Sequence, residues 1–317
     1  MSGIAVANRV FSLVSRLHVI VVGDFFVDRH IVIDPALEER SLETGLPAHQ
    51  GVSVRTSPGG AGNVAANLAA LGVGRVEVVG VIGDDGDGWT LRRDLARFGV
   101  LDSLVVEPAR LTPSYIKPRV LGGEQQRLDI RTREDVSADA EAEIVARLVR
   151  ADGVLVVDQL PRHGVVSDGI VNVLRHLDVR CLIDSRAGIS RFDFGHLKPN
   201  LQEATVALGD GTPLEHARTL ARRARQAAFV TCGPAGMAVG TPEEAQMVAA
   251  PLLDEPVDAV GAGDTAGAAL LCALCAGLSA REAARFAVAA AAVTVRKVGV
   301  TGTATRAEIE TMLGRHA

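Results

Sequence analysis

Residues 19–30 read VIVVGDFFVDRH, and this stretch decides the class of fold. Its first four residues form a continuous apolar, β-branched run that ends at Gly23, which is typical of a strand buried on both faces. Helical stretches separate it from similar runs, an order that predicts an α/β fold with a doubly wound, mostly parallel central sheet flanked by helices. Those runs lie at 76–83, 153–158, 180–185 and 227–233. Several end in Gly, Asp or Thr, so we expect polar groups at the carboxyl edge of the sheet, where open α/β folds bind ligands.

The composition limits the class of protein. The chain has 317 residues, of which 48% are hydrophobic, and this suits one large α/β domain or two small ones. A formal net charge of −5, with one Trp and one Tyr, does not fit the basic, aromatic-rich surface of a nucleic-acid-binding protein. The apolar runs are too short to cross a membrane as helices. We therefore expect neither a nucleic-acid partner nor a membrane span.

The N-terminal segment and the cysteines indicate the compartment. Residues 4–16 carry arginines within an apolar pattern, which predicts a short amphipathic helix rather than a signal peptide. Four cysteines without an export signal favour a reducing, cytoplasmic environment. Cys272 and Cys275 form a C-x-x-C pair, but their apolar helical surroundings favour packing over metal or redox chemistry.

Two segments interrupt the alternation of strands and helices. Residues 31–57 and 114–133 have the pattern of extended strands with turns. We expect them to form a small sheet that projects from the main domain. Because bare sheet edges invite pairing, this sheet also predicts a homodimer formed through it.

Residues 258–270, DAVGAGDTAGAAL, contain the strongest candidate for chemistry. Gly261, Ala262 and Gly263 are small, and the run after Asp264 is helical, so backbone N–H groups would converge at a helix N-terminus. Phosphoryl transfer needs such donors together with a carboxylate that accepts the proton of the attacking hydroxyl. Asp264 is either that base or only the N-cap of the helix.

Two further segments hold candidates for binding a sugar. In residues 57–72, Gly59 and Gly60 precede a helix that carries Asn63 and Asn67 on one face, so this segment either binds hydroxyl groups or only begins a helix. Asp24 and Asp28 follow the first strand and either accept hydrogen bonds from vicinal hydroxyls or stabilise a turn.

The remaining candidates belong to a nucleotide site. In residues 197–204, Asn200 and Glu203 either face a hydrated Mg²⁺ or form a capping box. In residues 230–236, a strand leads to a turn with Gly233 and Gly236, which either wraps a nucleotide or closes a hairpin.

Taken together, these segments resemble the ribokinase-like (PfkB) family of carbohydrate kinases over nearly the whole chain. PGGAGNVAANLAALG (58–72) looks like the first family signature, and DAVGAGDTAGAAL (258–270) matches the second, D-x-x-G-A-G-D. NLQE (200–203) matches the N-x-x-E motif, and VTCGPAG (230–236) matches the nucleotide loop.

The resemblance implies a single domain over residues 1–317, with a β-sheet lid, that transfers the γ-phosphate of ATP to a sugar hydroxyl. By this analogy Asp264 is the base, and the N–H groups of Ala262, Gly263 and Asp264 stabilise the charge that moves. Mg²⁺ accompanies ATP, and Asp258 helps to hold a monovalent cation such as K⁺. The analogy assigns magnesium and phosphates to Asn200 and Glu203, the rest of the nucleotide to Thr231, Gly233 and Gly236, and the sugar to Asp24, Asp28, Gly59, Gly60 and Asn63.

Within the family, the chain is most similar to the heptose-7-phosphate kinase branch. Residues 21–30 resemble the G-D-x-x-x-D-R-Y opening of that branch, and residues 115–130 resemble its R-V-x-x-x-x-Q-Q-x-x-R-L-D segment. A phosphorylated acceptor needs cations, which the second lid segment offers. The candidates are Lys117, Arg119, Arg127 and Arg131.

The chain also departs from this branch. DQLPRHG (158–164) stands where the branch has D-Y-x-K-G, and DSRAG (184–188) stands where it has D-P-K-G. Arg162, His163 and Arg186 are the candidates to replace the lysines, although Arg is not equivalent to Lys at a phosphate. Because the chain ends at Ala317, we expect no fused nucleotidyltransferase domain.

The sequence therefore predicts an ATP-dependent sugar or sugar-phosphate kinase. A nucleoside kinase on the same fold is one alternative, although the few aromatic residues argue against a slot for a base. A non-catalytic sugar- or nucleotide-binding regulatory protein is the other, although it would have no need of the base Asp264.

Overall fold

The computed structural model describes residues 1–148, 151–186, 188–253, 257–298 and 301–315. Within these ranges, the main sheet has nine strands. In spatial order they are β16 (Ala245–Val248), β15 (Met237–Gly240), β14 (Ala228–Thr231), β13 (His196–Leu197), β12 (Arg180–Ser185), β11 (Gly153–Asp158), β1 (His18–Gly23), β4 (Arg75–Val79) and β6 (Leu101–Asp102). Neighbours from β14 to β6 are parallel, whereas β15 and β16 are antiparallel additions at one edge.

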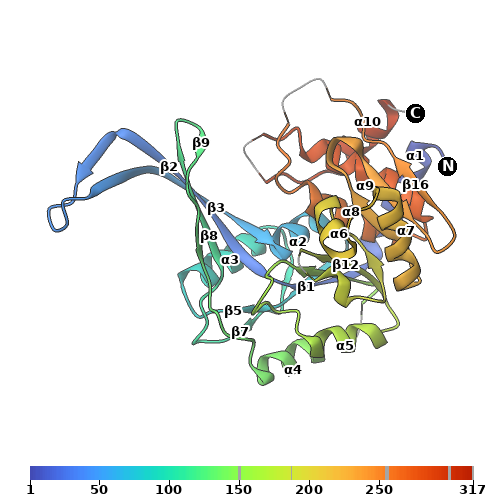
Figure 1. The fold of residues 1–317 in the computed structure, drawn as a ribbon, viewed down its shortest axis with the longest axis horizontal. Coiled ribbons are helices and arrows are strands. Elements are labelled where there is room, and N and C mark those ends of the chain that lie inside the picture. Colours follow the sequence, from blue (N-terminus) through green and yellow to red (C-terminus); the bar gives the residue numbers. More distant parts are fainter. Residues whose placement is uncertain (149–150, 187, 254–256, 299–300, 316–317) are drawn as a thin grey trace.

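Both faces of this sheet are covered by helices (Figure 1). Along β1, Val19 and Val21 pack into one core while Ile20 and Val22 pack into the other, because successive side chains of a strand point to opposite faces. The first core includes α1 (Gly3–Phe11), α2 (Ala61–Ala70), α3 (Gly86–Ala96), α8 (Ala262–Cys275), α9 (Ala280–Thr294) and α10 (Arg306–Arg315). The second includes α4 (Ala138–Arg147), α5 (Asp168–His176), α6 (Leu201–Leu208) and α7 (Pro213–Ala224).

A second sheet projects from the body and is called the lid below (Figure 1). Its strands are β10 (Leu128–Ile130), β8 (Ser114–Val120), β2 (Phe25–Arg40) and β3 (Pro47–Gly60), and β9 (Gly123–Glu124) pairs with β8. The two long strands β2 and β3 form a hairpin that extends beyond the rest of the lid. The expected strands in 31–57 and 114–133 are therefore present, and the first pair begins earlier and ends later than expected.

The N-terminal helix and several short elements complete the fold. The helix expected over residues 4–16 is shorter in the structure: α1 covers Gly3–Phe11, and residues 14–16 form the separate helix η1. The N-cap Ser2 of α1 accepts a hydrogen bond from the N–H of Ala5. Among the described residues, no helix has the length and apolar character needed to cross a membrane. The short elements are η1 (Val14–Arg16), η2 (Ile189–Arg191) and η3 (Gly233–Ala235), and the parallel pair β5 (Val81–Ile82) and β7 (Val105–Val106).

Candidate active site

The N-terminus of α8 forms the centre of the site. Gly261 is the N-cap with φ of 81°, a conformation that favours glycine. A Cβ added there would lie 3.0 Å from Asn63 Nδ2 and 3.0 Å from Thr301 Cγ2, so the turn also needs a residue without a side chain. Asp264 lies in the first turn of α8, and its Oδ2 accepts a hydrogen bond of 2.6 Å from Asn63 Nδ2.

The environment of Asp264 changes its acidity. Burial raises its pKa to about 6, while the hydrogen bond from Asn63 and the charge of Lys198 act in the opposite direction. The nearby carboxylates of Asp184 and Asp28 add to the rise. A carboxylate with a raised pKa is a better proton acceptor, as general-base catalysis requires.

The three backbone N–H groups predicted to stabilise charge, those of Ala262, Gly263 and Asp264, differ in their contacts, and their role stays a prediction. The N–H of Ala262 donates to the carbonyl of Ala259 at 3.2 Å. Within the described part of the chain, the N–H groups of Gly263 and Asp264 have no hydrogen-bond acceptor outside the helix. These two donors are therefore the ones that the helix N-terminus presents to an anion.

A buried chain of hydrogen bonds fixes Asn63 beside Asp264. Asn67 Nδ2 donates to the Asn63 carbonyl at 2.9 Å, and Asn67 Oδ1 accepts a bond of 2.7 Å from Thr265 Oγ1. Thr294 on α9 lies 3.0 Å from Thr265. The face of α2 proposed for sugar hydroxyls is thus partly used to join α2, α8 and α9, and the Asn67 side chain forms hydrogen bonds with Asn63 and Thr265.

Sequence reasoning missed a buried ion pair at this site. Lys198 Nζ lies 2.8 Å from Asp184 Oδ2, and both side chains are buried. The Lys198 side chain runs along α8, since its Cε would lie 3.4 Å from a Cβ added at Gly267. The charge of Asp184 raises the pKa of Lys198 against the lowering effect of burial. The sequence did offer a signal for this ion pair, because Lys198 directly follows a short buried strand and lies two residues before Asn200.

Asn200 and Glu203 form a capping box at the start of α6. Asn200 Oδ1 accepts the N–H of Glu203 at 2.8 Å, and Glu203 Oε2 accepts the N–H of Asn200 at 2.8 Å. Burial raises the pKa of Glu203, and the charge of Asp184 adds to the rise. Among the described residues, no group of three or more His, Cys, Asp or Glu side chains is arranged to hold a metal ion.

The predicted nucleotide loop is the turn of an antiparallel hairpin. β14 pairs with β15, and η3 lies between them. The N–H of Thr231 donates to the carbonyl of Pro199 at 3.0 Å, which places this turn beside Asn200. Gly233 has φ of 55° and Gly236 has φ of 98°, so glycine suits both positions.

Asp24 contacts the segment that follows β11. Its Oδ2 accepts the backbone N–H groups of Gln159 and Leu160 at 2.8 Å each, and its Oδ1 accepts the N–H of Val165 at 2.8 Å. Burial raises its pKa to about 6, although these backbone bonds oppose the rise. Both carboxylate oxygens are thus engaged by protein groups. Asp24 thus stabilises the chain segment that follows β11, which agrees with the alternative of a turn-stabilising residue, and sugar binding by Asp24 stays a prediction.

Asp28 and the glycine pair lie at the root of the lid. Gly59 pairs with Phe26 across β2 and β3, and a Cβ at Gly59 would lie 2.1 Å from the Phe26 ring. A Cβ at Gly60 would lie 2.5 Å from the same ring. The two glycines therefore leave room for the Phe26 ring. Asp28 lies on the face of the lid turned toward Asp264, because its charge acts on the pKa of Asp264.

The predicted lid cations are held by different partners. Lys117 Nζ lies 2.7 Å from Asp28 Oδ1. Arg127 makes two hydrogen bonds of 2.6 and 2.9 Å with Asp129, and its guanidinium lies 4.6 Å from the Tyr115 ring centroid. Lys117 is thus paired with a residue whose charge acts on the pKa of Asp264.

The other candidate cations differ in their contacts and exposure. Arg119 Nη2 donates to the Gly122 carbonyl at 3.2 Å, and Arg131 is partly buried. Arg186 is exposed directly after β12, and Arg162 is exposed as well. His163 pairs with Asp135 at 2.8 Å and is thereby held by that carboxylate.

Two further predictions concern residues in α8 and in the segment before it, outside the centre of the site. Asp258 Oδ1 accepts the N–H of Val260 at 3.0 Å, and its role toward a monovalent cation stays a prediction. Cys272 is buried in α8, and burial raises the pKa of Cys275 to about 11. These thiols are packed within the helix layer, in keeping with the expected packing role.

Known proteins are similar to this chain in sequence. Residues 21–169 and 194–307 match the pfkB family of carbohydrate kinases. The bifunctional protein HldE of Caulobacter sp. (strain K31) is 35% identical over 303 residues, which cover 89% of this chain and 60% of HldE. The chain thus spans about three fifths of the length of this curated relative.

Solved structures are similar in fold. Phosphofructokinase-2 from Escherichia coli, in complex with potassium, has a TM-score of 0.75 and 19% identity, covering 94% of this chain and 99% of that one. A putative ribokinase II from E. coli, in complex with ATP and Mg²⁺, has a TM-score of 0.71 and 19% identity. This similarity covers 95% of this chain and 100% of that one. The fold is therefore the ribokinase-like α/β fold.

The chain belongs to the pfkB family of carbohydrate kinases. It is accordingly a phosphotransferase with a sugar hydroxyl as acceptor.

Proposed function

We propose that this carbohydrate kinase phosphorylates a sugar that already carries a phosphate group, with a heptose 7-phosphate as the favoured acceptor. The observation that carries the proposal is the charge on the face of the lid turned toward Asp264. Asp28 and His30 of β2 lie beside Tyr115 and Lys117 of β8 on this face. Burial lowers the pKa of His30, and the charges of three nearby cations add to the decrease. These cations are Lys117, Arg55 and Arg119.

This face suits an acceptor with both hydroxyl and phosphate groups. The cations provide donors for a phosphate, while Asp28 provides a carboxylate that accepts hydrogen bonds from hydroxyl groups. The similarity to HldE, at 35% identity, supports a phosphorylated sugar as the class of acceptor. The particular sugar phosphate does not follow from this level of identity.

The chemistry follows from the start of α8. Asp264 would accept the proton of the acceptor hydroxyl as its oxygen attacks the γ-phosphorus of ATP and the bond to the bridging oxygen of ADP breaks. The N–H groups of Gly263 and Asp264 would stabilise the negative charge on the transferred group. Closure of the lid over the sugar would exclude water, which otherwise competes as an acceptor.

ATP and Mg²⁺ are the proposed co-substrate and cation. Mg²⁺ would neutralise charge on the phosphates of ATP. Asn200 and Glu203 lie next to the Thr231 turn, and would orient water ligands of the cation rather than form a dedicated cage. Thr231, Gly233 and Gly236 would line the nucleotide, and a K⁺ ion near Asp258 is a further element of the proposal.

We also propose that the protein is a homodimer formed through the lid. β3 lies at one edge of the lid sheet, and the face turned away from Asp264 carries apolar side chains. These side chains are Ile31, Ile33, Val54, Ile116 and Val120. A second lid would cover this apolar face and the open edge.

The test of the proposed reaction is release of ADP from ATP in the presence of Mg²⁺ and K⁺. Hexoses, pentoses, nucleosides, heptoses and their monophosphates serve as acceptors, with the Asp264→Asn variant measured in parallel. We expect turnover with a sugar phosphate, and a loss on the order of 10²–10⁴-fold in the variant, the range for a general base. ATP binding should be retained, as titration calorimetry would show.

Other outcomes have distinct meanings. Turnover with nucleosides alone would favour a nucleoside kinase. Turnover with sugars that lack a phosphate group would contradict the proposed role of the lid cations in binding a phosphorylated acceptor. An equally active Asp264→Asn variant would refute the proposed base. ATP binding without turnover on any acceptor would favour the non-catalytic binder.

A further inference from the structure

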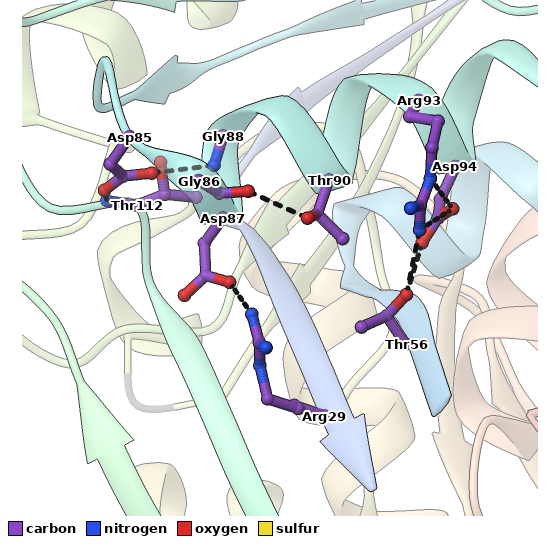
Figure 2. Close-up of polar contacts among 10 residues, drawn as sticks. All are labelled: Arg29, Thr56, Asp85, Gly86, Asp87, Gly88, Thr90, Arg93, Asp94 and Thr112. Carbon is purple, nitrogen blue, oxygen red and sulfur yellow. Dashed lines mark hydrogen bonds and ion pairs between the residues drawn. The ribbon is translucent and has the colours of Figure 1, made fainter. Parts of the chain in front are cut away.

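Helix α3 lies against the root of the lid, and the segment GDDGDG (83–88) at its start has no part in the site described above. Arg29 of β2 and Thr56 of β3 are cross-strand neighbours on the face of the lid turned away from Asp264. Both side chains reach α3, as Figure 2 shows. Arg29 forms an ion pair with Asp87, and Thr56 Oγ1 donates a hydrogen bond of 2.8 Å to Asp94 Oδ2.

Two residues on one face of α3 hold this pair of lid residues. Asp87 and Asp94 are seven residues apart, which is about two turns, so both lie on one face of the helix. Arg93 strengthens the second contact, because its guanidinium donates to Asp94 at 2.8 and 2.9 Å and to Thr56 at 3.2 Å. Asp94 is buried, so this contact is shielded from solvent.

The third lid strand is held from the same helix. Asp85, the N-cap of α3, accepts the N–H of Gly88 at 2.7 Å with one oxygen and the N–H of Thr112 at 2.8 Å with the other (Figure 2). Thr112 Oγ1 accepts the N–H of Gly83 at 2.9 Å, and β8 begins two residues later at Ser114. A Cβ at Gly88 would lie 2.5 Å from the Gly83 carbonyl, so the close approach requires glycine.

We propose that α3 is the anchor of the lid, and that Asp87 and Asp94 are positioning residues for the acceptor. Arg29 follows Asp28 directly, and the two side chains lie on opposite faces of β2. Asp87 and Asp94 hold the outer face of the lid root against α3. Their contacts thereby set the angle at which Asp28 and Lys117, on the inner face, approach Asp264. Loss of the anchor should weaken acceptor binding while leaving the ATP side unchanged. The acceptor part of this inference rests on the proposed function, whereas the anchor itself does not.

The experiment uses two pairs of variants of the full chain. Asp87→Asn breaks the contact with Arg29, and its control Asp102→Asn breaks the ion pair of 2.8 Å between Arg92 of the same helix and Asp102 of β6. Thr56→Val removes the hydroxyl that binds Asp94. Its control Thr90→Val removes a hydroxyl that bonds only within α3, to the Gly86 carbonyl at 2.8 Å.

The first measurement needs no substrate. Hydrogen–deuterium exchange of the free protein should rise in residues 25–34 and 51–60 of Asp87→Asn and Thr56→Val, and stay unchanged in both controls, because exchange reports local opening. Trp89 offers a second signal, since it is the single tryptophan and Arg93 lies 5.2 Å from its ring. Thr56→Val releases Arg93 from the lid and should shift the fluorescence of Trp89, whereas Asp102→Asn should not.

The second measurement is kinetic, with the sugar phosphate that gives turnover in the ADP-release assay. KM for the acceptor should rise on the order of 2- to 30-fold in Asp87→Asn and Thr56→Val, as expected for coupling through contacts, with KM for ATP unchanged. Asp87→Glu should recover most of the acceptor affinity, because it restores the charge opposite Arg29.

Each outcome decides the inference. Unchanged exchange in the lid of both variants would show that α3 is not its anchor. Raised exchange with an unchanged acceptor KM would overturn the positioning role. If the wild-type protein phosphorylates no sugar phosphate, the proposed function fails, and the exchange and fluorescence data still decide whether α3 anchors the lid.

Discussion

At the scale of the residue, Asp264 owes its chemistry to two separate causes. The sequence places it in the first turn after the glycines of 261–263, where a helix N-terminus favours negative charge. Burial by the surrounding structure then raises its pKa to about 6. The first cause is local, and the second depends on α2, the lid and the Asp184–Lys198 pair.

The raised pKa of Asp264 predicts the pH dependence of the reaction. Below about pH 6 the carboxyl group is protonated and accepts no proton from the acceptor hydroxyl. We therefore expect kcat/KM to rise with pH through an apparent pKa near 6 and to level off above it. A profile of kcat/KM from pH 4.5 to 8.5, in buffers of constant ionic strength, tests this. A flat profile down to pH 4.5 would argue against Asp264 as the base.

Asp24 has an effect on stability that can be separated from catalysis. Asp24→Asn replaces one acceptor oxygen by an NH₂ group facing backbone N–H donors, so at least one of the bonds to Gln159, Leu160 or Val165 is lost. We expect the free energy of unfolding to fall by about 1–3 kcal/mol, the cost of leaving a buried polar group without a partner. Urea unfolding at pH 7.5 measures this. Asp34→Asn, at a partly buried position of the lid hairpin, is the control.

At the scale of the element, the hairpin β14–β15 shows why two glycines of one turn are not equivalent. Both have positive φ, but a Cβ at Gly236 would lie 2.1 Å from the carbonyl oxygen of Val248 in β16. A Cβ at Gly233 has no atom within 4 Å. The turn therefore depends on Gly236 for packing as well as for conformation.

Substitution of these glycines by alanine should separate the two effects. Gly233→Ala carries only the cost of a left-handed conformation, about 1–2 kcal/mol. Gly236→Ala carries the same conformational cost, and the added methyl group also displaces β16. The free energy of unfolding of the Gly236→Ala variant should therefore be lower than that of the Gly233→Ala variant. Thermal unfolding of both variants measures the difference. Equal Tm values would show that β16 yields to the added methyl group without cost.

At the scale of the whole molecule, the lid has two chemically different faces. The face toward Asp264 is polar and cationic, and the outer face is covered by α3 only at its root. Val54 on the outer face is 58% exposed, although a fully solvated apolar sheet face is unusual in a monomer. This exposure is the physical reason to expect a second copy.

The dimer is tested by light scattering on the purified protein. We expect a dimer at micromolar concentration and a shift to monomer in Val54→Asp, because a buried, unpaired carboxylate is costly at an apolar interface. Val206→Asp is the matched control, since Val206 is 78% exposed on α6 in the body of the protein. A monomeric wild-type protein, or a Val54→Asp variant that stays dimeric, would contradict the proposed interface.

Much of the fold could be predicted because its signals are local. The continuous apolar runs predicted the parallel strands β1, β11, β12 and β14, and the two extended segments predicted the lid. The run at 76–83 was predicted as one strand, whereas the structure divides it at Gly80 into β4 of the main sheet and β5 of a separate pair. The short strand β13 and the edge strands β15 and β16 escaped prediction, because runs of two to four residues carry little periodicity. The capping-box alternative at Asn200 and Glu203 is present in the structure, and it does not exclude the predicted role toward phosphates.

By itself, the sequence determined the class of fold, the order of the motifs and the backbone turns that need glycine, because strand burial, helix caps and positive φ depend on neighbouring residues. The tertiary structure alone decided which groups meet at the site. Asn63 and Asp264 are 201 residues apart, and Lys198 and Asp184 come from separate segments that the parallel sheet brings to one edge. It also decided that Asp24 binds backbone rather than remaining open, and that Arg29 and Thr56 reach α3. Such contacts depend on packing between distant elements, which leaves no periodic signal in the chain.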